Sequence, residues 1–420
     1  MKITSSSTSI LRIWWHKHAS MLLSFAVALM SVFALMKLGE EFWRLTLDSS
    51  SIGAIDLKFR YIEVRRWFEG KPVYSELDKA VYPPASYVML WPLLGWLGAV
   101  TPARWVWAAT TLGALVWLVY LVVKESGADT TLERIFVALI PLSMNATGST
   151  IGNGQLTVHI VPALLAGLLL LQERRQSWSK DMLASISVLF ALVKPSITVP
   201  FFWIALFIPG KVRPALLITL EYIGLNLFAV SFQEPGLLSL FHDWLVRASA
   251  VTVREAYANL HTWLAALGLA EWSLPASLFT LVALGFWIYL NRRVDIWLLL
   301  GVTAIVARFW TYHRWYDDLL ILLPMIALFR IAKKGSSDNG SDIIAGILLA
   351  ITLLSMLAPY RVQNLPSPWS LLFTGGHAIV WIVLLIFLLI RAWQEKTRRL
   401  ADESITRIAR FPTTQHFSSG

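Results

Sequence analysis

Long apolar runs recur from one end of the chain to the other, and this pattern limits the possible folds more than any motif does. Runs of helical length fall at about 21–38, 104–123, 134–149, 156–171, 181–193, 196–209, 214–232, 275–290, 295–310, 318–331, 342–358 and 369–390. A bilayer interior offers the backbone no hydrogen-bond partner, so repeated apolar segments favour transmembrane helices. The sequence therefore predicts an all-α polytopic membrane protein with about twelve transmembrane helices.

Composition supports this fold class and excludes several kinds of function. Hydrophobic residues make up 56% of the 420 residues, which is far from the balance of a soluble protein. The net charge of +10 comes from basic residues in short loops, which is typical of membrane proteins and does not indicate nucleic acid. Cysteine is absent, so the chain has no disulfide, no thiolate nucleophile and no cysteine metal site.

The N-terminal segment resembles both a signal peptide and a first span. Lys2, Arg12 and Lys17 precede the first apolar run, but no small-residue cleavage pattern follows it. We expect an uncleaved anchor in the inner or plasma membrane. Placing the N-terminus in the cytoplasm puts most of the basic excess on the cytoplasmic side. Both termini are therefore predicted to be cytoplasmic.

Two arrangements of residues 181–210 are open. In the first, two short spans meet at Lys194-Pro195 and residues 86–100 form a juxtamembrane helix on the outer face. In the second, 181–210 is one kinked helix and 86–100 crosses the membrane. We expect the first, because Arg174, Arg175, Lys180, Lys211 and Arg213 flank this segment and favour the cytoplasm at both ends.

These assignments give one integral-membrane domain over residues 1–390 and a basic cytoplasmic tail over 391–420. The domain includes a first outer loop at 39–103 and a second outer loop at 233–274. Both outer loops are expected to carry juxtamembrane helices. In the first loop this is the segment 86–100, and in the second the polar and apolar residues have amphipathic spacing. No internal repeat of clear period is found, which disfavours inverted-repeat transporters.

Polar residues suited to chemistry gather in the predicted outer segments. The first outer loop follows the first span with an aspartate, tyrosines and a double proline. Shorter elements follow later in the chain. In order, the set is Asp56, Tyr61, Gly70, Tyr74, Tyr82-Pro83-Pro84, Gly154-Gln155, Lys194-Pro195 and the segment 308–318, which includes Arg308, His313, Tyr316 and Asp317.

On these residues the chain resembles glycosyltransferase family 87, the polyprenyl-phosphate-mannose-dependent mannosyltransferase-like proteins of the C-type membrane fold (GT-C). The resemblance implies a GT-C-like fold and inverting transfer of a hexose, with mannose as the sugar, from a polyprenyl-phosphate donor. Transfer to an acceptor hydroxyl is expected on the extracytoplasmic side. The resemblance also implies that Asp56, shortly after the first span, is the essential aspartate.

The residues fit this chemistry independently of the resemblance. Inverting transfer needs a base for the acceptor hydroxyl and positive charge for the leaving phosphate. Asp56 is the candidate base; the alternative is a solvated loop acid paired with Lys58 or Arg60. Lys194 is the candidate phosphate ligand, because an ionisable group between two apolar runs usually faces a cavity or a partner. The alternative is a lysine that extends to the interface from a helix end.

The remaining candidates belong to the donor and acceptor sites. His313 and Arg308 are predicted to bind the donor phosphate with Lys194. The predicted substrate-binding residues are Tyr61, Tyr82, Gln155, Tyr316 and Asp317. The alternatives are an aromatic and cationic cluster at the membrane interface for 308–318, and turn packing for Gln155 and for Tyr82-Pro83-Pro84.

No cofactor is expected; a divalent metal is left open but is not indicated, because Asp56, Glu63, Glu69 and Asp78 of the first outer loop form no closely spaced pair. The predicted partners are a polyprenyl-phosphate sugar donor, the bilayer, and a glycolipid, cell-envelope glycan or protein acceptor, with no nucleic acid. A lipid-linked sugar flippase or transporter is the alternative function. A polysaccharide polymerase or ligase is less favoured, because its main loop usually comes late in the chain.

Overall fold

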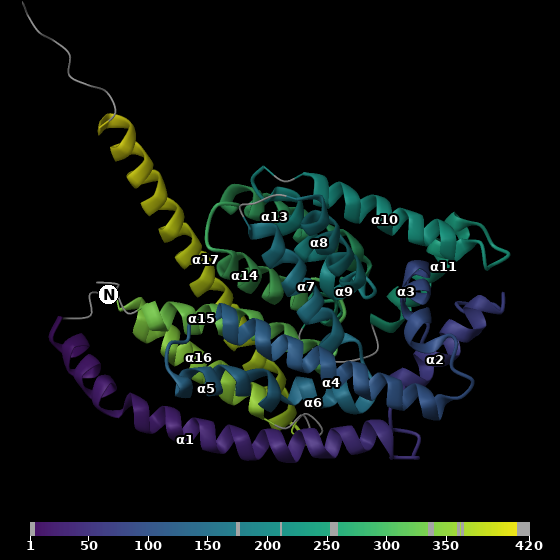
Figure 1. Cartoon of the computed structure of the whole chain (residues 1–420), viewed down its shortest axis with the longest axis horizontal. Helices are drawn as coiled ribbons and strands as arrows, with labels where there is room; N and C mark the ends of the chain where they lie inside the picture. The colour runs from purple at the N-terminus through teal and green to yellow at the C-terminus, as the bar shows by residue number, and fades with distance from the viewer. Residues whose placement is uncertain are drawn as a thin grey trace, which may run out of the picture.

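Helices form every regular element in the part of the chain that the computed structural model describes, which is residues 5–173, 177–210, 212–252, 259–334, 340–358, 362 and 365–409. Two helices are much longer than the others: α1 (Ser5–Thr46) runs along one side, and α17 (Trp369–Ala409), the last in the chain, projects away at its C-terminal end (Figure 1). Between them lie α2 (Ile55–Phe68), α3 (Pro84–Leu94), α4 (Val100–Glu125), α5 (Thr131–Ser143), α6 (Asn145–Asn153), α7 (Thr157–Gln172), α8 (Trp178–Ala191), α9 (Pro195–Phe207), α10 (Arg213–Val230), α11 (Leu237–Thr252), α12 (Leu260–Ala266), η1 (Ala270–Trp272), α13 (Ser273–Asn291), α14 (Ile296–Phe309), η2 (Trp315–Ile321), α15 (Leu322–Lys334) and α16 (Ser341–Leu357).

Every apolar run of the sequence forms helix, which confirms the all-α membrane class, but the prediction of about twelve spans is not confirmed. Among the described residues, five helices are long and apolar enough to cross a bilayer, or six if the bent pair α5–α6 counts as one. Several other apolar helices, such as α7 and α9, are only 10–17 residues long. Apolar content alone does not give the roughly 20 helical residues that a span requires.

Of the two arrangements of residues 181–210, the structure adopts the two short helices. α8 ends at Ala191 and α9 begins at Pro195, and Lys194 between them has a non-helical backbone with φ −125° and ψ 82°. Proline disfavours helical geometry in the residue before it and is well suited to the first helical position, so the break falls where the sequence indicates.

The two predicted outer loops contain helices. α1 continues to Thr46, past the expected start of the first loop at residue 39, and α2 and α3 occupy much of the rest. α3 has 11 residues, too few to span, and begins directly after Pro83. The second loop forms α11 and α12 as expected. The predicted basic tail continues α17 to Ala409, and residues 410–420 lie outside the described range.

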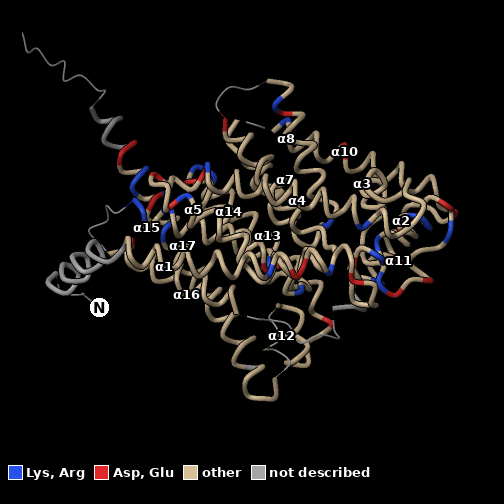
Figure 2. The backbone as a smooth tube through the Cα atoms, turned by 60° about the horizontal axis from the view of Figure 1, so that its bottom comes forward, with Lys and Arg blue, Asp and Glu red and all other residues tan. Residues whose placement is uncertain are grey.

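Charged residues are distributed unevenly over the fold. They gather near α2 and α11 at one end and near α5, α15 and the end of α17 at the other, with long uncharged stretches between (Figure 2). An exception is the contact of α1 with α6. There Glu41 is buried between Lys37, at 2.7 Å, and Arg44, at 3.0 Å. Gly152 leaves room for this triad, because a Cβ there would lie 1.9 Å from a Glu41 carboxylate oxygen.

Arg104 near the start of α4 caps the C-terminal end of α1. Its guanidinium donates to the backbone carbonyls of Leu45 at 2.6 Å, Arg44 at 2.9 Å and Asp48 at 2.7 Å. The last carbonyls of a helix lack partners within the helix and carry its negative dipole end. This contact therefore fixes where α1 ends and where the segment leading to α2 begins.

We expect Arg104→Met to lower the free energy of unfolding by about 3 kcal/mol, because three carbonyls lose a charged donor together. Arg134→Met is the matched control, since the exposed Arg134 makes one 3.3 Å bond to the Ala128 carbonyl. Thermal unfolding of both variants in detergent measures the difference. Equal losses in the two variants would contradict the capping role of Arg104.

Candidate active site

Four segments that are far apart in the sequence meet around one group of charged and polar side chains. They are the start of α2, the α6–α7 turn, the α8–α9 turn and η2. The Thr150 hydroxyl of α6 donates to the Tyr316 carbonyl of η2 at 3.2 Å, and Thr157 of α7 donates to the Asp317 carboxylate at 3.1 Å. These contacts set η2 against both helices beside the α6–α7 turn.

Lys194 and Asp317 form the central ion pair of this group. The Lys194 ammonium lies 2.5 Å from an Asp317 oxygen and 4.8 Å from the centre of the Tyr316 ring. The Lys194 side chain is 13% exposed and that of Asp317 is 3% exposed. Lys194 therefore does not extend to the surface from a helix end, as the alternative assumed, but is held inside the protein.

The charge of Asp317 is stabilised by its neighbours. Burial acts to raise the pKa of its carboxyl group, but the charge and hydrogen bond of Lys194, together with the charge of Arg308, outweigh burial and lower that pKa below its usual value. The Arg314 backbone N–H also donates to its second oxygen at 3.4 Å. Asp317 is thus an ionised, buried carboxylate whose main partner is Lys194.

Asp56 lies in the first turn of α2, within range of several cations. Burial raises the pKa of its carboxyl group, while a hydrogen bond from the Gln155 amide and the charges of Arg60, Arg314 and Lys194 act in the opposite direction. Lys58 does not pair with Asp56 but donates to the Ser50 carbonyl at 2.8 Å. The structure thus brings Asp56, Gln155 and Lys194 into one electrostatic neighbourhood, although their functional roles remain predictions.

Arg308 lies in the last turn of α14, and His313 lies in the segment between α14 and η2. Arg308 is buried, pairs with Asp318 and lies 5.1 Å from the centre of the Trp381 ring. His313 is fully buried and its Nδ1 lies 2.9 Å from the Thr311 carbonyl, so that nitrogen is the donor and Nε2 carries the lone pair. Burial lowers the pKa of His313 to about 3. A neutral ring of this kind accepts a hydrogen bond at Nε2 and does not offer a phosphate a positive charge.

The three predicted tyrosines occupy different surroundings. The Tyr61 hydroxyl donates to the Leu97 carbonyl at 2.8 Å and accepts from Arg65 at 3.0 Å, so its contacts join α2 to the segment before α4. Tyr82 lies under the Arg60 guanidinium, 4.3 Å from it, and Tyr316 lies under Lys194. Tyr82 and Tyr316 therefore belong to the charged group, while the hydroxyl contacts of Tyr61 are structural.

From the sequence, Arg60 is named only as a possible partner of Asp56 and Glu63 is given no role in the site; the structure adds both residues to the group. Their side chains are 2.7 Å apart and both are buried. The signal was available in the spacing, because positions 56, 60 and 63 fall on one face of a helix. It was missed because this polar segment was read as a loop and not as a helix.

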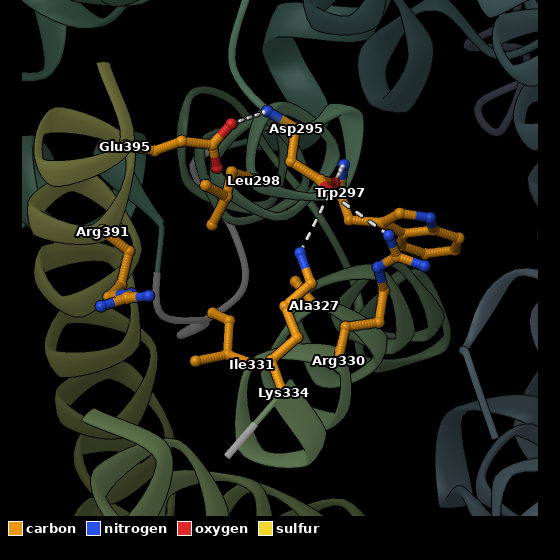
Figure 3. A pocket seen from close by; sticks show the side chains of 9 residues that line it. All are labelled: Asp295, Trp297, Leu298, Ala327, Arg330, Ile331, Lys334, Arg391 and Glu395. Carbon is orange, nitrogen blue, oxygen red and sulfur yellow. Dashed lines mark hydrogen bonds and ion pairs between the residues drawn. The ribbon is translucent and has the colours of Figure 1, made fainter. Parts of the chain in front are cut away.

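A small cavity lies at the other end of α14. It has a volume of 60 Å3 and is lined by Asp295, Trp297, Leu298, Ala327, Arg330, Ile331, Lys334, Arg391 and Glu395 (Figure 3). Asp295 there pairs with Arg330 at 3.2 Å. Its carboxylate also accepts a hydrogen bond from the backbone N–H of Trp297 in the first turn of α14. Since α14 has 14 residues, this cavity is about 20 Å along the helix from Arg308.

No group of three or more acid, histidine or cysteine side chains suited to a metal ion occurs within the described ranges. The acids of the site are instead matched by cations, as the pairs of Asp317 with Lys194 and of Asp318 with Arg308 show. Independence from metal remains a prediction.

The fold and the site together define a helical membrane protein with buried ionised side chains where its helix ends meet. The sequence model of glycosyltransferase family 87 matches residues 80–332. The chain belongs to glycosyltransferase family 87 and is therefore a glycosyltransferase. No curated protein and no solved structure matches it. The match includes Lys194, His313 and Asp317 but begins after Asp56.

We expect Gly154→Ala to reduce sugar transfer strongly. Gly154 has a φ of +70°, and a Cβ there would lie 2.5 Å from Cβ of Leu57, the neighbour of Asp56. The clash displaces the first turn of α2, and a shift of about 1 Å at a catalytic group can cost roughly 100-fold in rate. The measurement is the transfer rate of the purified variant.

Gly127→Ala is the control for this change. Gly127 has a φ of +74° but no atom within 4 Å of the added Cβ, so its variant carries only the cost of left-handed backbone, about 1–2 kcal/mol. Similar transfer rates in the two variants would show that Gly154 does not position α2.

We expect Asp317→Asn to lower the free energy of unfolding by about 3 kcal/mol, because the ammonium of Lys194 loses its buried counter-charge. The double variant Lys194→Met/Asp317→Asn should lose less than the sum of the single variants Lys194→Met and Asp317→Asn. Thermal unfolding measures all three. The exposed pair of Glu69 with Lys71, 2.7 Å apart, is the control, and Glu69→Gln should leave the unfolding temperature close to that of the wild type. Additive losses at Lys194 and Asp317 would rule out their coupling.

Proposed function

We propose that this glycosyltransferase moves a hexose, with mannose as the expected sugar, from a polyprenyl-phosphate donor to an acceptor hydroxyl on the extracytoplasmic side. One observation carries the proposal. Asp56, a carboxylate with a raised pKa, lies within range of the cations Lys194 and Arg314, which come from distant parts of the chain. A base next to concentrated positive charge is what transfer from a sugar phosphate to a hydroxyl requires.

In the proposed step, Asp56 accepts the proton of the acceptor hydroxyl as its oxygen bonds to the anomeric carbon. The bond from that carbon to the phosphate oxygen breaks, and the electron pair leaves with the lipid phosphate. The new bond forms on the face opposite the leaving group, so a β-linked donor gives an α-linked product. The Gln155 amide, which hydrogen-bonds Asp56, orients the carboxyl group.

Lys194 is the proposed ligand of the leaving phosphate. It is held between Asp317 and the Tyr316 ring, which keeps its ammonium group in place before the donor binds. The donor phosphate shares this ammonium with Asp317, and the negative charge that develops on leaving strengthens the contact. Arg308 contributes through its charge, since Asp318 holds it. His313, neutral at Nε2, suits a donor-sugar hydroxyl better than a phosphate.

The acceptor and the lipid chain fit the surroundings of this site. The bilayer-length helices carry many exposed apolar side chains, as on α10 with Leu216, Leu220 and Ile223, which suit lipid contact. Tyr82 and Tyr316 add aromatic faces next to the charged group, and sugars commonly pack against such faces. Glycolipid, glycan and protein acceptors all present the hydroxyl that this step requires.

We expect Asp56→Asn to lower the transfer rate by about 100-fold to 10,000-fold, because an amide cannot accept the hydroxyl proton. The assay supplies purified protein with labelled polyprenyl-phosphate mannose and a panel of acceptors. Asp78→Asn is the control: Asp78 is an exposed acid of the same outer segment whose partner is Arg247, at 3.1 Å. Transfer that survives in Asp56→Asn would remove Asp56 as the base. Movement of the lipid-linked sugar without any transfer would favour a flippase.

A further inference from the structure

The face of α2 that carries Asp56 also carries a buried arginine and a buried glutamate. Arg60 follows Asp56 by four positions and Glu63 follows by seven, so the three side chains lie one above another on the helix. Arg60 and Glu63 are 6% and 1% exposed. A helix segment of this composition is expensive to bury unless its charges are matched.

Arg60 is held from several sides. Its Nη2 lies 2.7 Å from a Glu63 oxygen and donates to the Lys79 carbonyl at 2.6 Å. Its guanidinium also lies 4.3 Å from the centre of the Tyr82 ring. Its Nη1 is buried and has no hydrogen-bond partner among the described residues. Arg60 is therefore fixed in place while one of its donor nitrogens remains unused.

We propose that Arg60 is a positioning residue for the proposed sugar transfer, on which this inference rests: Glu63, the Lys79 carbonyl and Tyr82 fix its guanidinium, which keeps the Asp56 carboxyl group ionised and ready to accept the hydroxyl proton. Asp56 sits in surroundings that favour its neutral form, which cannot act as a base. A cation one helical turn away opposes that tendency without contacting the substrate.

The charges around Asp56 support this role. Burial raises the pKa of Asp56. The charge of Arg60 acts against this rise in pKa more strongly than the charge of Arg314 or of Lys194 does. Arg60 is also the one of these three cations on the helix of Asp56, so it moves with the carboxylate. In the described part of the chain, the other groups that interact with Asp56, Arg60 or Glu63 include Gln155, Arg314, Lys194, Tyr82, Tyr87, Tyr74 and Tyr316.

Glu63 acts differently from Asp56. Burial raises the pKa of Glu63 to about 8, even though Arg60 opposes the rise. Glu63 is thus largely protonated below about pH 8, and the charge of Arg60 is then available to Asp56. Because the folded-state pKa of Glu63 is raised above 4.5, its contribution to stability is full below pH 4.5 and is lost as the pH rises through about 8.

The test compares four single variants with the wild type in kcat/KM for transfer as a function of pH. In the plot of kcat/KM against pH, the acidic limb is the part in which the rate falls at low pH. Arg60→Gln should move this limb to higher pH by about one unit, and the rate should recover at higher pH. Arg60→Lys keeps the charge and should leave the limb near its wild-type position. Glu63→Gln should also leave it there, because Glu63 is already neutral in that range. Arg66→Gln is the control, since Arg66 pairs with Glu76 on the exposed side of α2.

A second measurement guards against misfolding. The double variant Arg60→Gln/Glu63→Gln replaces both buried ionisable side chains together and should show the same shift of the limb as Arg60→Gln. The thermal unfolding temperature of the wild type should fall from pH 5 to pH 8.5, and that of Glu63→Gln should fall less.

If the wild type is active and the acidic limb does not move in Arg60→Gln or in the double variant, the proposed role of Arg60 is wrong and the proposed function is unaffected. A loss of activity at every pH in both of these variants also overturns the role of Arg60. A wild type without transfer overturns the proposed function itself and this inference with it.

Discussion

The buried ion pair of Lys194 with Asp317 is the interaction on which the arrangement of the site depends. It joins the break between α8 and α9 to η2, two segments more than a hundred residues apart. A lysine inside a helical membrane protein is costly without a counter-charge, and so is a buried aspartate. Each therefore requires the other, and Thr157 and the Arg314 backbone complete the bonding of Asp317. This pairing sets Lys194 near Asp56.

Near this pair, the pKa values of two carboxyl groups are shifted in opposite directions by their surroundings. Asp317 is ionised because cations surround it closely, whereas burial raises the pKa of Asp56 towards the range of a useful base. Glu63 forms a third case, since burial raises its pKa to about 8 despite the adjacent Arg60. Carboxyl groups whose pKa values are shifted so differently within one neighbourhood are typical of functional sites.

Much of the fold followed from local sequence. The apolar runs gave the helices, and Lys194-Pro195 and Pro83-Pro84 gave breaks where the structure has them, because proline restricts its own backbone and that of the preceding residue. The number of spans was overestimated, because apolar runs such as that of α9 make helices too short for a bilayer. The helix α2 was missed, since its charges suggested a loop and its burial depends on α3 and the segments packed around it.

By itself, the sequence determined the helical membrane class, the helix breaks and which residues were chemically suited to sugar transfer, because hydropathy and backbone restrictions act over short distances along the chain. Only the tertiary structure decided the partners: Lys194 with Asp317, Arg308 with Asp318 and Arg60 with Glu63. It also decided that His313 is neutral and buried. Partner choice and ionisation depend on the distance and burial of groups far apart in the chain, and sequence spacing does not encode these quantities locally.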